Sequence, residues 1–321
     1  MKDLTRHIFL NYAVSFDTLN RFSAKRKNED WINEKLVDPI TEFIPIWQNK
    51  NLVSKDKPRR MISLTGADLT ARNIQRDSAV FLGEMNDKFY FAIQLPSENE
   101  TEAEPPVLEF LFSDLKNYAP LLRPEDCALM AYAGLMINWH NQTRYCGVCG
   151  SKTISTEAGH VLKCSSEQCG KLHFPRTDIA VIALITNGDE CLLARQPWWG
   201  NKLYSLLAGY VEPAETFEDA LEREVFEETG LRLASMEYVA SQPWPFSNSV
   251  MIGYNAVAVD KSVKLDNEEL EDARWFTRDD IKSELKDGKI TLPSPTSISY
   301  YLIERWFDKG KCGLLKELLT K

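Results

Sequence analysis

The 321-residue chain contains no apolar run long enough to cross a membrane. The longest run, residues 179–185, has seven residues, whereas a helix that spans the bilayer needs about 20. Lys2 and Arg6 carry charges where a signal peptide places its apolar core. The chain ends at Lys321 without the Ser-Lys-Leu signal of peroxisomal proteins. We therefore expect an intracellular protein with no membrane partner, cytoplasmic in the first instance, with the peroxisome and the mitochondrion left open.

The chain also lacks an excess of bases and any internal repeat. Its 38 lysines and arginines face 47 acids, which gives a net charge of −9. This balance argues against avid, non-specific binding to nucleic acid or anionic membrane, although a metal ion or a local basic patch can still hold phosphates. With 44% apolar residues, the chain is typical of a globular protein of two or three domains. A disordered tail, a collagen and a disulfide-stapled miniprotein are excluded.

Apolar spacing and turn residues predict an outline of the secondary structure. In the first 120 residues, strand-like runs at 78–82 and 89–93 precede an acidic, proline-ended loop at 97–106. Apolar residues at helical spacing predict a helix at 124–140 that leads into a cysteine cluster. After the cluster we expect strands at 178–186, 191–194, 236–241 and 250–259, and helices at 216–229 and 297–307.

Four of the seven cysteines crowd into one short segment. They are Cys146, Cys149, Cys164 and Cys169. Two pairs on short turns can bring four thiolates into a tetrahedron, which is the geometry of a closed, structural zinc site. The alternatives are a redox Cys-x-x-Cys motif or unrelated buried cysteines. We read His160 as a non-ligand because four thiols complete the site, and we read Cys127, Cys191 and Cys312 as ordinary residues.

An acidic helix is the most informative segment of the chain. Thr216 is a good N-cap with Asp219 as its capping-box partner, and Gly230 can take the left-handed position that ends a helix. Between positions 209 and 231, eight acids stand against one base, Arg223. We expect a buried stripe on this helix formed by Phe217, Ala220, Leu221, Val225 and Leu231.

Three carboxylates of this helix share one face. Glu224, Glu227 and Glu228 stand at i, i+3 and i+4, where they repel one another. A solvated acidic face is the simple interpretation. Clustered carboxylates are also the ligands of hard divalent cations, and Mg²⁺ binds through carboxylates together with substrate phosphates. The cluster beside a glycine-initiated loop therefore points to metal-assisted chemistry on phosphates.

The spacing Gly-x5-Glu-x7-Arg-Glu-Val-x-Glu-Glu-x-Gly-Leu, which starts at Gly209, resembles the Nudix hydrolase box at every fixed position. Residues 241–249 (SQPWPFSNS) resemble the signature of the NADH pyrophosphatase subfamily, with Ser247 in place of the usual proline. The cysteine ribbon, residues 174–176 (FPR) and residues 269–275 (ELEDARW) are further features of that subfamily. The resemblance covers roughly residues 120–305, and no motif in the first 120 residues matches.

The resemblance implies a fold and a domain organisation. We expect α+β and α/β architecture, with a Nudix α/β/α sandwich preceded by a four-cysteine zinc ribbon and an N-terminal mixed α/β domain. The expected boundaries are 1–122 for a divergent N-terminal domain, 123–175 for a linking helix and the zinc ribbon, 176–308 for the Nudix domain and 309–321 for a C-terminal tail.

The resemblance also implies roles for the charged residues. Glu224 and Glu228 are expected to bind Mg²⁺ or Mn²⁺, and Glu269 to complete that metal site or to act as base. Glu227 is expected to join them or to transfer a proton, so the identity of the base stays open. Arg223 is expected to orient the glutamates, or to act as a simple helical ion-pair partner. Glu215 is expected to support the junction of loop and helix.

Further positions are expected to contact the dinucleotide. Tyr210 and Phe174 resemble residues that stack on a base, with core packing as the alternative. Ala208 and Ser299 match positions whose backbone lies beside the substrate. The signature segment is expected to line the same site, through Gln242, Pro243, Trp244, Pro245, Phe246, Ser247, Asn248 and Ser249.

These residues together predict an activity. The resemblance implies metal-dependent hydrolysis of the pyrophosphate of NADH, and of NAD, to nicotinamide mononucleotide and AMP, and also removal of NAD caps from RNA 5′ ends. The expected cofactors are catalytic Mg²⁺ or Mn²⁺ and structural Zn²⁺, and the expected assembly is a homodimer. The alternatives are a Nudix hydrolase of another nucleotide conjugate such as ADP-ribose, and a non-catalytic zinc-ribbon module that binds RNA or protein.

Overall fold

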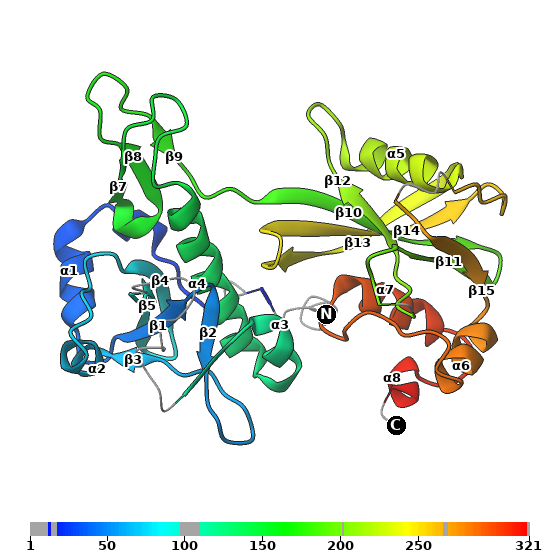
Figure 1. The fold of residues 1–321 in the computed structure, drawn as a ribbon, viewed down its shortest axis with the longest axis horizontal. Helices are drawn as coiled ribbons and strands as arrows, with labels where there is room; N and C mark the ends of the chain where they lie inside the picture. The colour runs from blue at the N-terminus through cyan, green and yellow to red at the C-terminus, as the bar shows by residue number, and fades with distance from the viewer. Residues whose placement is uncertain (1–11, 14–17, 97–109, 201, 266–268, 320–321) are drawn as a thin grey trace. The chain divides into compact units, whose positions relative to one another are not determined.

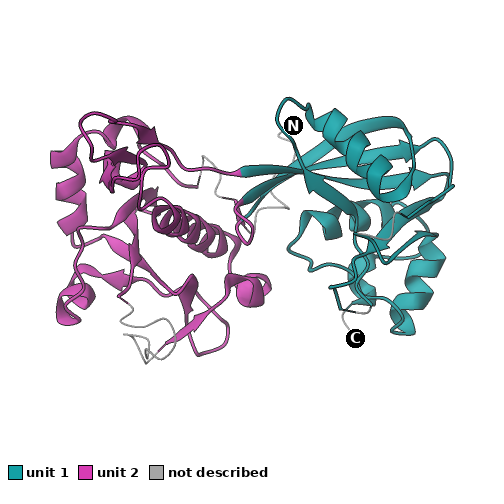
Figure 2. Ribbon diagram, turned by 45° about the horizontal axis from the view of Figure 1, so that its top comes forward, with its two compact units in different colours: residues 1–9, 178–244, 249–321 teal, residues 10–177, 245–248 magenta. Residues whose placement is uncertain are grey.

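The computed structural model describes residues 12–13, 18–96, 110–200, 202–265 and 269–319. The chain divides into two units (Figure 2): the C-terminal unit contains residues 1–9, 178–244 and 249–321, and the N-terminal unit contains residues 10–177 and 245–248. The predicted acidic loop at 97–106 lies outside the described residues. In the ranges that the structure describes, no helix is long and apolar enough to cross a bilayer.

The C-terminal unit is built on a six-stranded mixed sheet. Its strands are β10 (Asp178–Asn187), β11 (Glu190–Arg195), β12 (Leu207–Tyr210), β13 (Leu233–Trp244), β14 (Ser249–Ala258) and β15 (Asp272–Phe276). They follow the order β13-β14-β10-β11-β15, and β12 also pairs with β10. The pair β10–β14 is parallel, and the other pairs are antiparallel.

Helices cover both faces of this sheet because successive strand residues point to opposite sides. Val181, Ala183 and Ile185 of β10 pack in one cluster with α5 (Phe217–Thr229). Ile182 and Leu184 pack in another cluster with α7 (Ile298–Phe307). Figure 1 shows α5 on one side of the sheet, and α6 (Arg278–Lys286), α7 and α8 (Leu315–Leu318) on the other. The predicted α/β/α sandwich is confirmed.

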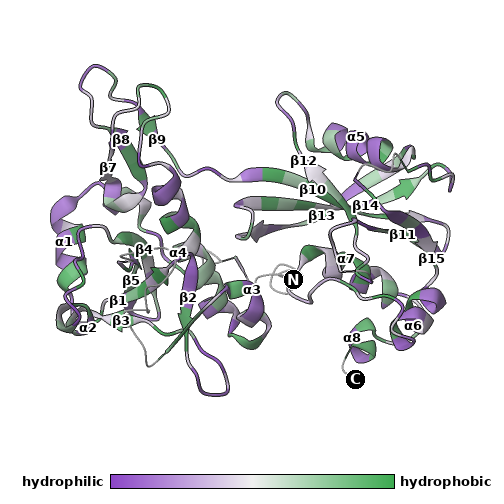
Figure 3. Ribbon diagram, viewed as in Figure 1, coloured by the Kyte–Doolittle hydropathy of each residue, from purple (hydrophilic) through white to green (hydrophobic). Residues whose placement is uncertain are grey.

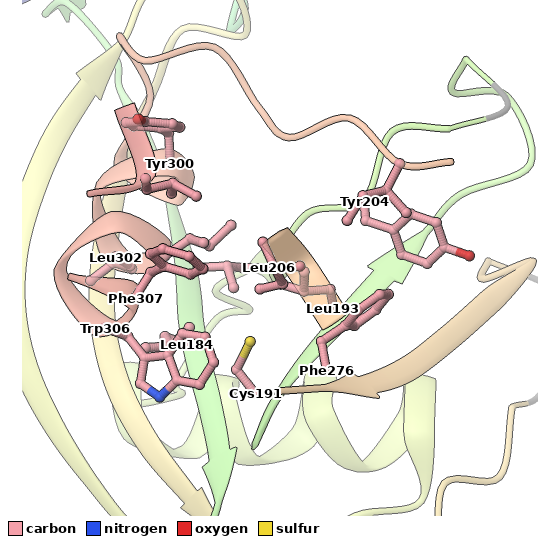
Figure 4. Packing of buried hydrophobic residues seen from close by; sticks show 14 of the residues in the cluster. Leu184, Cys191, Leu193, Tyr204, Leu206, Phe276, Tyr300, Leu302, Trp306 and Phe307 are labelled. Atoms are coloured by element: carbon pink, nitrogen blue, oxygen red, sulfur yellow. The ribbon is translucent and has the colours of Figure 1, made fainter. Parts of the chain in front are cut away.

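The core between α7 and the sheet is rich in aromatic side chains. Figure 4 shows Phe307 and Leu302 of α7 close to Leu184 and Leu206, with Phe276 of β15 beside Leu193 and Tyr204. Figure 3 shows the same division along the chain: apolar residues follow β10, whereas much of α5 is polar. The continuous apolar run that predicts β10 from sequence therefore reflects the two covered faces of the sheet.

Most elements expected from the sequence are present. The strands predicted at 178–186 and 250–259 are β10 and β14, and the helices predicted at 216–229 and 297–307 are α5 and α7. One detail of α5 is wrong: Phe217 is 36% exposed at the first helical position and does not extend the buried stripe. The other four stripe residues, Ala220, Leu221, Val225 and Leu231, are buried.

The N-terminal unit contains a second six-stranded sheet. Its strands are β1 (Glu42–Trp47), β2 (Lys50–Val53), β3 (Leu64–Thr65), β4 (Val80–Met85), β5 (Lys88–Gln94) and β6 (Leu111–Ser113). The helical segments around it are η3 (Ser23–Lys25), α1 (Glu29–Val37), α2 (Gly66–Ala71), α3 (Leu115–Tyr118), η4 (Ala119–Leu121) and α4 (Pro124–Gln142). The helix predicted at 124–140 is α4, which packs on β1, β4 and β5.

The two sheets share one topology. The strand order β4-β5-β1-β2-β6, with β3 attached to β1, repeats the order β13-β14-β10-β11-β15, with β12 attached to β10. In each sheet the pair at the centre, β1–β5 or β10–β14, is parallel. A helix follows the attached strand in both units, but α2 has six residues where α5 has 13. The N-terminal unit is thus a second copy of the same fold without the acidic helix.

A three-stranded ribbon extends the N-terminal unit. It consists of β7 (Thr153–Thr156), η5 (Glu157–Gly159), β8 (Val161–Cys164) and β9 (Leu172–His173). Two histidines fasten it to the unit: His140 Nε2 lies 2.7 Å from the Gly159 carbonyl, and His160 Nε2 lies 2.7 Å from the Phe81 carbonyl. Burial lowers the pKa of His160 to about 4, so the imidazole is neutral and donates its proton to the carbonyl.

Candidate active site and metal centre

The ribbon brings its four cysteines together. The sulfur atoms of Cys146, Cys149, Cys164 and Cys169 all lie within 4.8 Å of one another. The Cys146–Cys169 and Cys149–Cys164 sulfurs are 3.8 Å and 3.3 Å apart. Four thiolates at 2.3 Å from a tetrahedral zinc ion lie about 3.8 Å apart. The donor set and its spacing fit zinc, and four protein ligands leave no open position.

The backbone around the cysteines is shaped for thiolates. Gly150 has a φ of 75° and donates its N–H to the Cys146 carbonyl, and the Val148 N–H points to the Cys146 sulfur at 3.5 Å. Hydrogen bonds from Ser151 lower the pKa of Cys149 to about 6. Removal from water raises the pKa of Cys164 to about 12. The second thiolate therefore needs the positive charge that a bound zinc ion supplies.

One ribbon contact was missed in the sequence analysis. His173 Nε2 lies 3.3 Å from the Cys146 sulfur. A ring nitrogen at this distance can donate a hydrogen bond to a thiolate without being a ligand. The position of His173 directly before residues 174–176 was the available signal. His160, in contrast, bonds to Phe81, in agreement with its interpretation as a non-ligand.

The residues at the two ends of the acidic helix α5 determine where it begins and where it ends. The Thr216 hydroxyl accepts the Asp219 N–H at 3.1 Å and donates to the Asp219 carboxylate at 2.7 Å, and Gly230 ends the helix at a φ of 70°. The Asp219 side chain therefore bonds to the Thr216 hydroxyl, where a full capping box would use the Thr216 backbone N–H. Both predicted ends are present, and they fix which residues face the sheet.

The carboxylate of Glu224 lies directly over the backbone of Gly209. A Cβ atom at position 209 would come within 1.9 Å of the Glu224 Cδ and within 2.3 Å of both its oxygens. Any side chain there would displace this carboxylate. The first glycine of the box is therefore required by close approach and gives Glu224 a fixed place against β12.

Arg223 connects the carboxylates of this site. Its guanidinium donates to both Glu215 oxygens at 2.6 and 3.0 Å. The same group donates to Glu224 at 2.9 Å and to Glu227 at 3.1 Å. It also donates to the Tyr210 carbonyl at 2.9 Å. Glu215 in addition accepts the Glu212 N–H at 2.9 Å, which ties the loop to the helix.

The remaining carboxylates lie in different environments. Burial raises the pKa of Glu224, and the negative charges of Glu227 and Glu269 raise it further. Glu228 is 4% exposed, whereas Glu227 and Glu269 lie at the surface. In the described part of the chain, the cysteines are the one set of three or more acidic, histidine or cysteine residues whose ligand atoms all lie within 4.8 Å.

The residues present fit a divalent cation. Glu224, Glu228 and Glu269 offer hard oxygen ligands, although the structure does not bring the oxygens of all three within 4.8 Å of one another. Burial, and then neighbouring negative charge, raises the pKa of Glu224, and a bound cation would offset both effects. These three glutamates would hold the ion, and Arg223 would keep Glu224 and Glu227 oriented beside it.

The expected substrate-stacking side chains are accessible. Tyr210 is 52% exposed at the end of β12, and its hydroxyl lies 3.3 Å from the hydroxyl of Ser249, the first residue of β14. Ala208 is half-buried in β12 opposite Ile182. Phe174 belongs to the N-terminal unit and is 62% exposed. Both rings are exposed rather than packed in the core, and their stacking on a base stays a prediction.

Two residues expected at the substrate also have side chains that hold α7, and their role at the substrate stays a prediction. The buried Gln242 side chain donates to the Thr296 carbonyl and accepts the Ile298 N–H, both at 2.7 Å. The Ser299 hydroxyl lies 2.8 Å from the Ser205 hydroxyl and accepts the Leu206 N–H. In this structure the side chains of Gln242 and Ser299 therefore position the helix start.

The rest of the signature forms the end of β13 and the turn to β14. Pro243 and Trp244 are half-buried in β13. Pro245, Phe246 and Ser247 follow, and the Phe246 ring meets Tyr12 edge-on at 5.2 Å. Asn248 has a φ of 55° and donates its side-chain N–H to the Arg176 carbonyl at 2.8 Å. The contacts of Phe246 and Asn248 shape the turn, and a role in substrate binding stays a prediction.

Comparisons with known proteins agree with this site. Residues 176–293 match the NUDIX domain, residues 141–174 the NADH pyrophosphatase zinc ribbon domain, and residues 41–139 the NADH pyrophosphatase-like rudimentary NUDIX domain. A protein of Macaca fascicularis, NAD-capped RNA hydrolase NUDT12, is 34% identical over 330 aligned residues, which cover 90% of this chain and 71% of that protein. The chain belongs to the Nudix hydrolases.

Bacterial relatives of this Nudix hydrolase carry a similar name. NAD-capped RNA hydrolase NudC of Stutzerimonas stutzeri is 40% identical over 195 residues, which cover 61% of this chain and 67% of that protein. NudC of Mycobacterium bovis is 32% identical over 276 residues, which cover 81% and 87%. The rudimentary NUDIX match also explains the shared sheet topology, which the sequence analysis missed because α2 carries no box.

Proposed function

We propose that this Nudix hydrolase cleaves the pyrophosphate of NADH and NAD to nicotinamide mononucleotide and AMP, and removes NAD caps from RNA 5′ ends. The Glu224 carboxylate held against Gly209 by Arg223 carries the proposal. The names of the relatives support it, since they are called NAD-capped RNA hydrolases. A homodimer is part of the proposal and is tested by light scattering of the purified protein.

The proposed reaction is a hydrolysis at phosphorus. The oxygen of a water molecule bonds to one phosphorus, the bridging P–O bond breaks, and the water proton passes to a carboxylate. Glu224, Glu228 and Glu269 would hold Mg²⁺ or Mn²⁺, which would supply positive charge to the pyrophosphate and lower the pKa of water. Glu227 and Glu269 are the surface carboxylates near Glu224 and the candidates for the proton acceptor.

The other residues hold and orient the site. Arg223 fixes Glu224 and Glu227 through charge-assisted hydrogen bonds, which are about twice as strong as neutral ones. Tyr210 offers a flat face for a base of the dinucleotide, and Phe174 is a separate candidate for such stacking. The four cysteines hold structural zinc and take no part in the bond exchange.

A hydrolysis panel tests the proposal. The purified protein is incubated with Mg²⁺ and equal concentrations of NADH, NAD and ADP-ribose, and the products are identified by mass. We expect AMP and reduced nicotinamide mononucleotide in equal amounts from NADH. Faster cleavage of ADP-ribose than of NADH would favour a different Nudix substrate. No AMP from any dinucleotide would favour a non-catalytic binding module.

A further inference from the structure

A basic cavity of the N-terminal unit lies beside the starts of β1, β5 and α4. It has a volume of about 810 Å³ and is lined in part by Glu42 at the start of β1, by Lys88 and Tyr90 at the start of β5, and by Arg123 at the N-cap of α4. In the C-terminal unit, the strand equivalent to β5 is β14, which starts at Ser249 beside the Tyr210 hydroxyl. The cavity therefore lies at the strand end that corresponds to the end of the C-terminal sheet that carries Ser249.

Among the residues that the structure describes, this copy has no counterpart of the acidic helix. Its helix α2 (GADLTA) has Asp68 as its single acid, where α5 has the box glutamates. The Asp68 carboxylate is occupied at the helix start, where it accepts the N–H and the hydroxyl of Thr65 at 2.8 and 2.6 Å. A ligand in this cavity would be bound and left intact.

The cavity wall is basic although the whole chain is acidic. Its lining contains Lys57, Arg59, Arg60, Lys88 and Arg123. The acids in the lining are Glu42, Asp56 and Asp126. Five bases thus stand against three acids in a chain whose net charge is −9. Such a local reversal of charge attracts anions.

Two of these acids are already neutralised. Asp126, with a side chain 3% exposed, accepts from Arg123 Nε and Nη2 at 2.9 and 2.7 Å, and Glu42 accepts from Lys88 Nζ at 2.6 Å. Arg123 itself is 73% exposed, so its remaining N–H groups face outward. Asp126 and Glu42 therefore hold the side chains of Arg123 and Lys88 in fixed positions, which is the role of supporting residues around a binding site.

The loop before β3 supplies the unneutralised charge. Arg59 donates to the Ser54 carbonyl at 2.7 Å, a neutral partner that leaves its positive charge uncompensated. Lys57 and Arg60 are exposed, and Asp56 is the one acid of the lining in this loop. Arginine and lysine at several points around one cavity are the pattern of phosphate recognition.

We propose that this cavity is a non-catalytic binding site for the phosphates of a nucleotide, either free or as the first residues of an RNA strand. The RNA strand as ligand rests on the proposed function, because an enzyme that removes NAD caps also encounters the RNA strand that follows the cap. The free source is a mononucleotide such as AMP. Both offer the same phosphoryl oxygens to Lys57, Arg59, Arg60 and Arg123.

The test measures binding without catalysis. A short fluorescent RNA with a 5′-monophosphate is titrated without Mg²⁺ against the full chain, the double variant Lys57→Gln and Arg60→Gln, and a control double variant, Lys25→Gln and Lys27→Gln, of equal charge outside the cavity. We expect the cavity variant to bind the RNA several-fold more weakly than the wild type. The slope of log affinity against log salt concentration should become shallower by about 1.4, because two phosphate contacts to a single strand are lost. The control keeps wild-type binding, and the variant Lys57→Arg with Arg60→Lys retains it.

Competition by AMP distinguishes the two sources. If AMP displaces the RNA and binds the cavity variant less tightly than wild type, the ligand is a nucleotide in general. If AMP does not compete, the site needs the strand. The proposal would be overturned if the cavity variant bound RNA as tightly as the wild type does and also bound AMP as tightly as the wild type does. NADH hydrolysis by the cavity variant is expected to stay at the wild-type rate, so a failure of the proposed activity is recognised separately.

Discussion

At the scale of single residues, the site depends on contacts rather than on residue types alone. Glu224 is useful because Gly209 lets its carboxylate lie on the backbone and because Arg223 holds it there. The box pattern predicts which residues matter. It does not predict that the Gln242 side chain bonds to the start of α7, or that the Ser299 side chain of α7 bonds to the segment beside that helix. These partners are more than 50 residues away in sequence. The predicted burial of Phe217 is wrong for a similar reason, because helical spacing does not determine how exposed a residue of the first helical turn is.

The first prediction concerns the close approach at Gly209. In Gly209→Ala, the added Cβ displaces the Glu224 carboxylate, and we expect kcat for NADH to fall about 100-fold, as for a shift of about 1 Å in a catalytic group. Gly134→Ala is the matched control, because a Cβ at position 134 meets nothing within 4 Å. Steady-state kinetics measure the effect. Wild-type turnover in Gly209→Ala would contradict the placement of Glu224.

At the scale of elements, the sequence predicts the long strands and helices well. The strands β10 and β14 and the helices α4, α5 and α7 each have a long periodic apolar pattern. The short strands β12 and β15 are not predicted, because four or five residues give too little pattern. The mixed α/β class of the N-terminal unit, its strands β4 and β5 and its helix α4 were predicted. Its Nudix topology was missed because the six-residue α2 has no motif, and the strand order and the rudimentary NUDIX match show its relation to the C-terminal unit.

The second prediction concerns the joint between β13 and α7. In Gln242→Ala, the Thr296 carbonyl and the Ile298 N–H lose their partner in a buried place, so we expect a loss of about 2–4 kcal/mol in the free energy of unfolding. KM for NADH should change less than threefold at temperatures where the variant is folded. Urea denaturation and kinetics measure both quantities. An unchanged stability with a large rise in KM would show that Gln242 binds substrate directly.

The third prediction concerns the ribbon. In Cys164→Ser, one of the four sulfur ligands is replaced by a weaker one, so we expect the protein to lose about one zinc ion per chain. Metal content is measured by mass spectrometry after dialysis. Cys312→Ser is the matched control, because Cys312 bonds to Asp279 outside the cluster. An equal zinc content in both variants would contradict the site.

At the scale of the whole molecule, an active Nudix copy is joined to an inactive one that carries the zinc ribbon. The two units share their strand order, yet α2 has a single acid where α5 carries the box glutamates. The buried histidines at the base of the ribbon give the N-terminal unit a dependence on pH. Burial, and then the charge of Arg26, lower the pKa of His160 to about 4.

The fourth prediction follows from that shift. Below pH 6.5 the unfolded chain gains a proton at position 160, while the folded protein does not until about pH 4. Stability is therefore full above about pH 7 and falls as the pH decreases, by about 2 kcal/mol at pH 5. Urea denaturation of the zinc-loaded protein at pH 7 and pH 5 measures the effect. In His160→Asn, the free energy of unfolding should differ between the two pH values by about 2 kcal/mol less than in the wild type. An identical pH dependence in both proteins would contradict the neutral His160.

The most direct test of the account is the release of AMP from NADH as Mg²⁺ is added, for the wild type and for Glu228→Gln. The substitution keeps the shape of a buried side chain and removes its charge. We expect AMP release by the wild type to require Mg²⁺, and the variant to lose about 100-fold or more in kcat while its melting temperature changes little. Near-normal turnover in Glu228→Gln, or AMP release by the wild type without any divalent ion, would contradict the account.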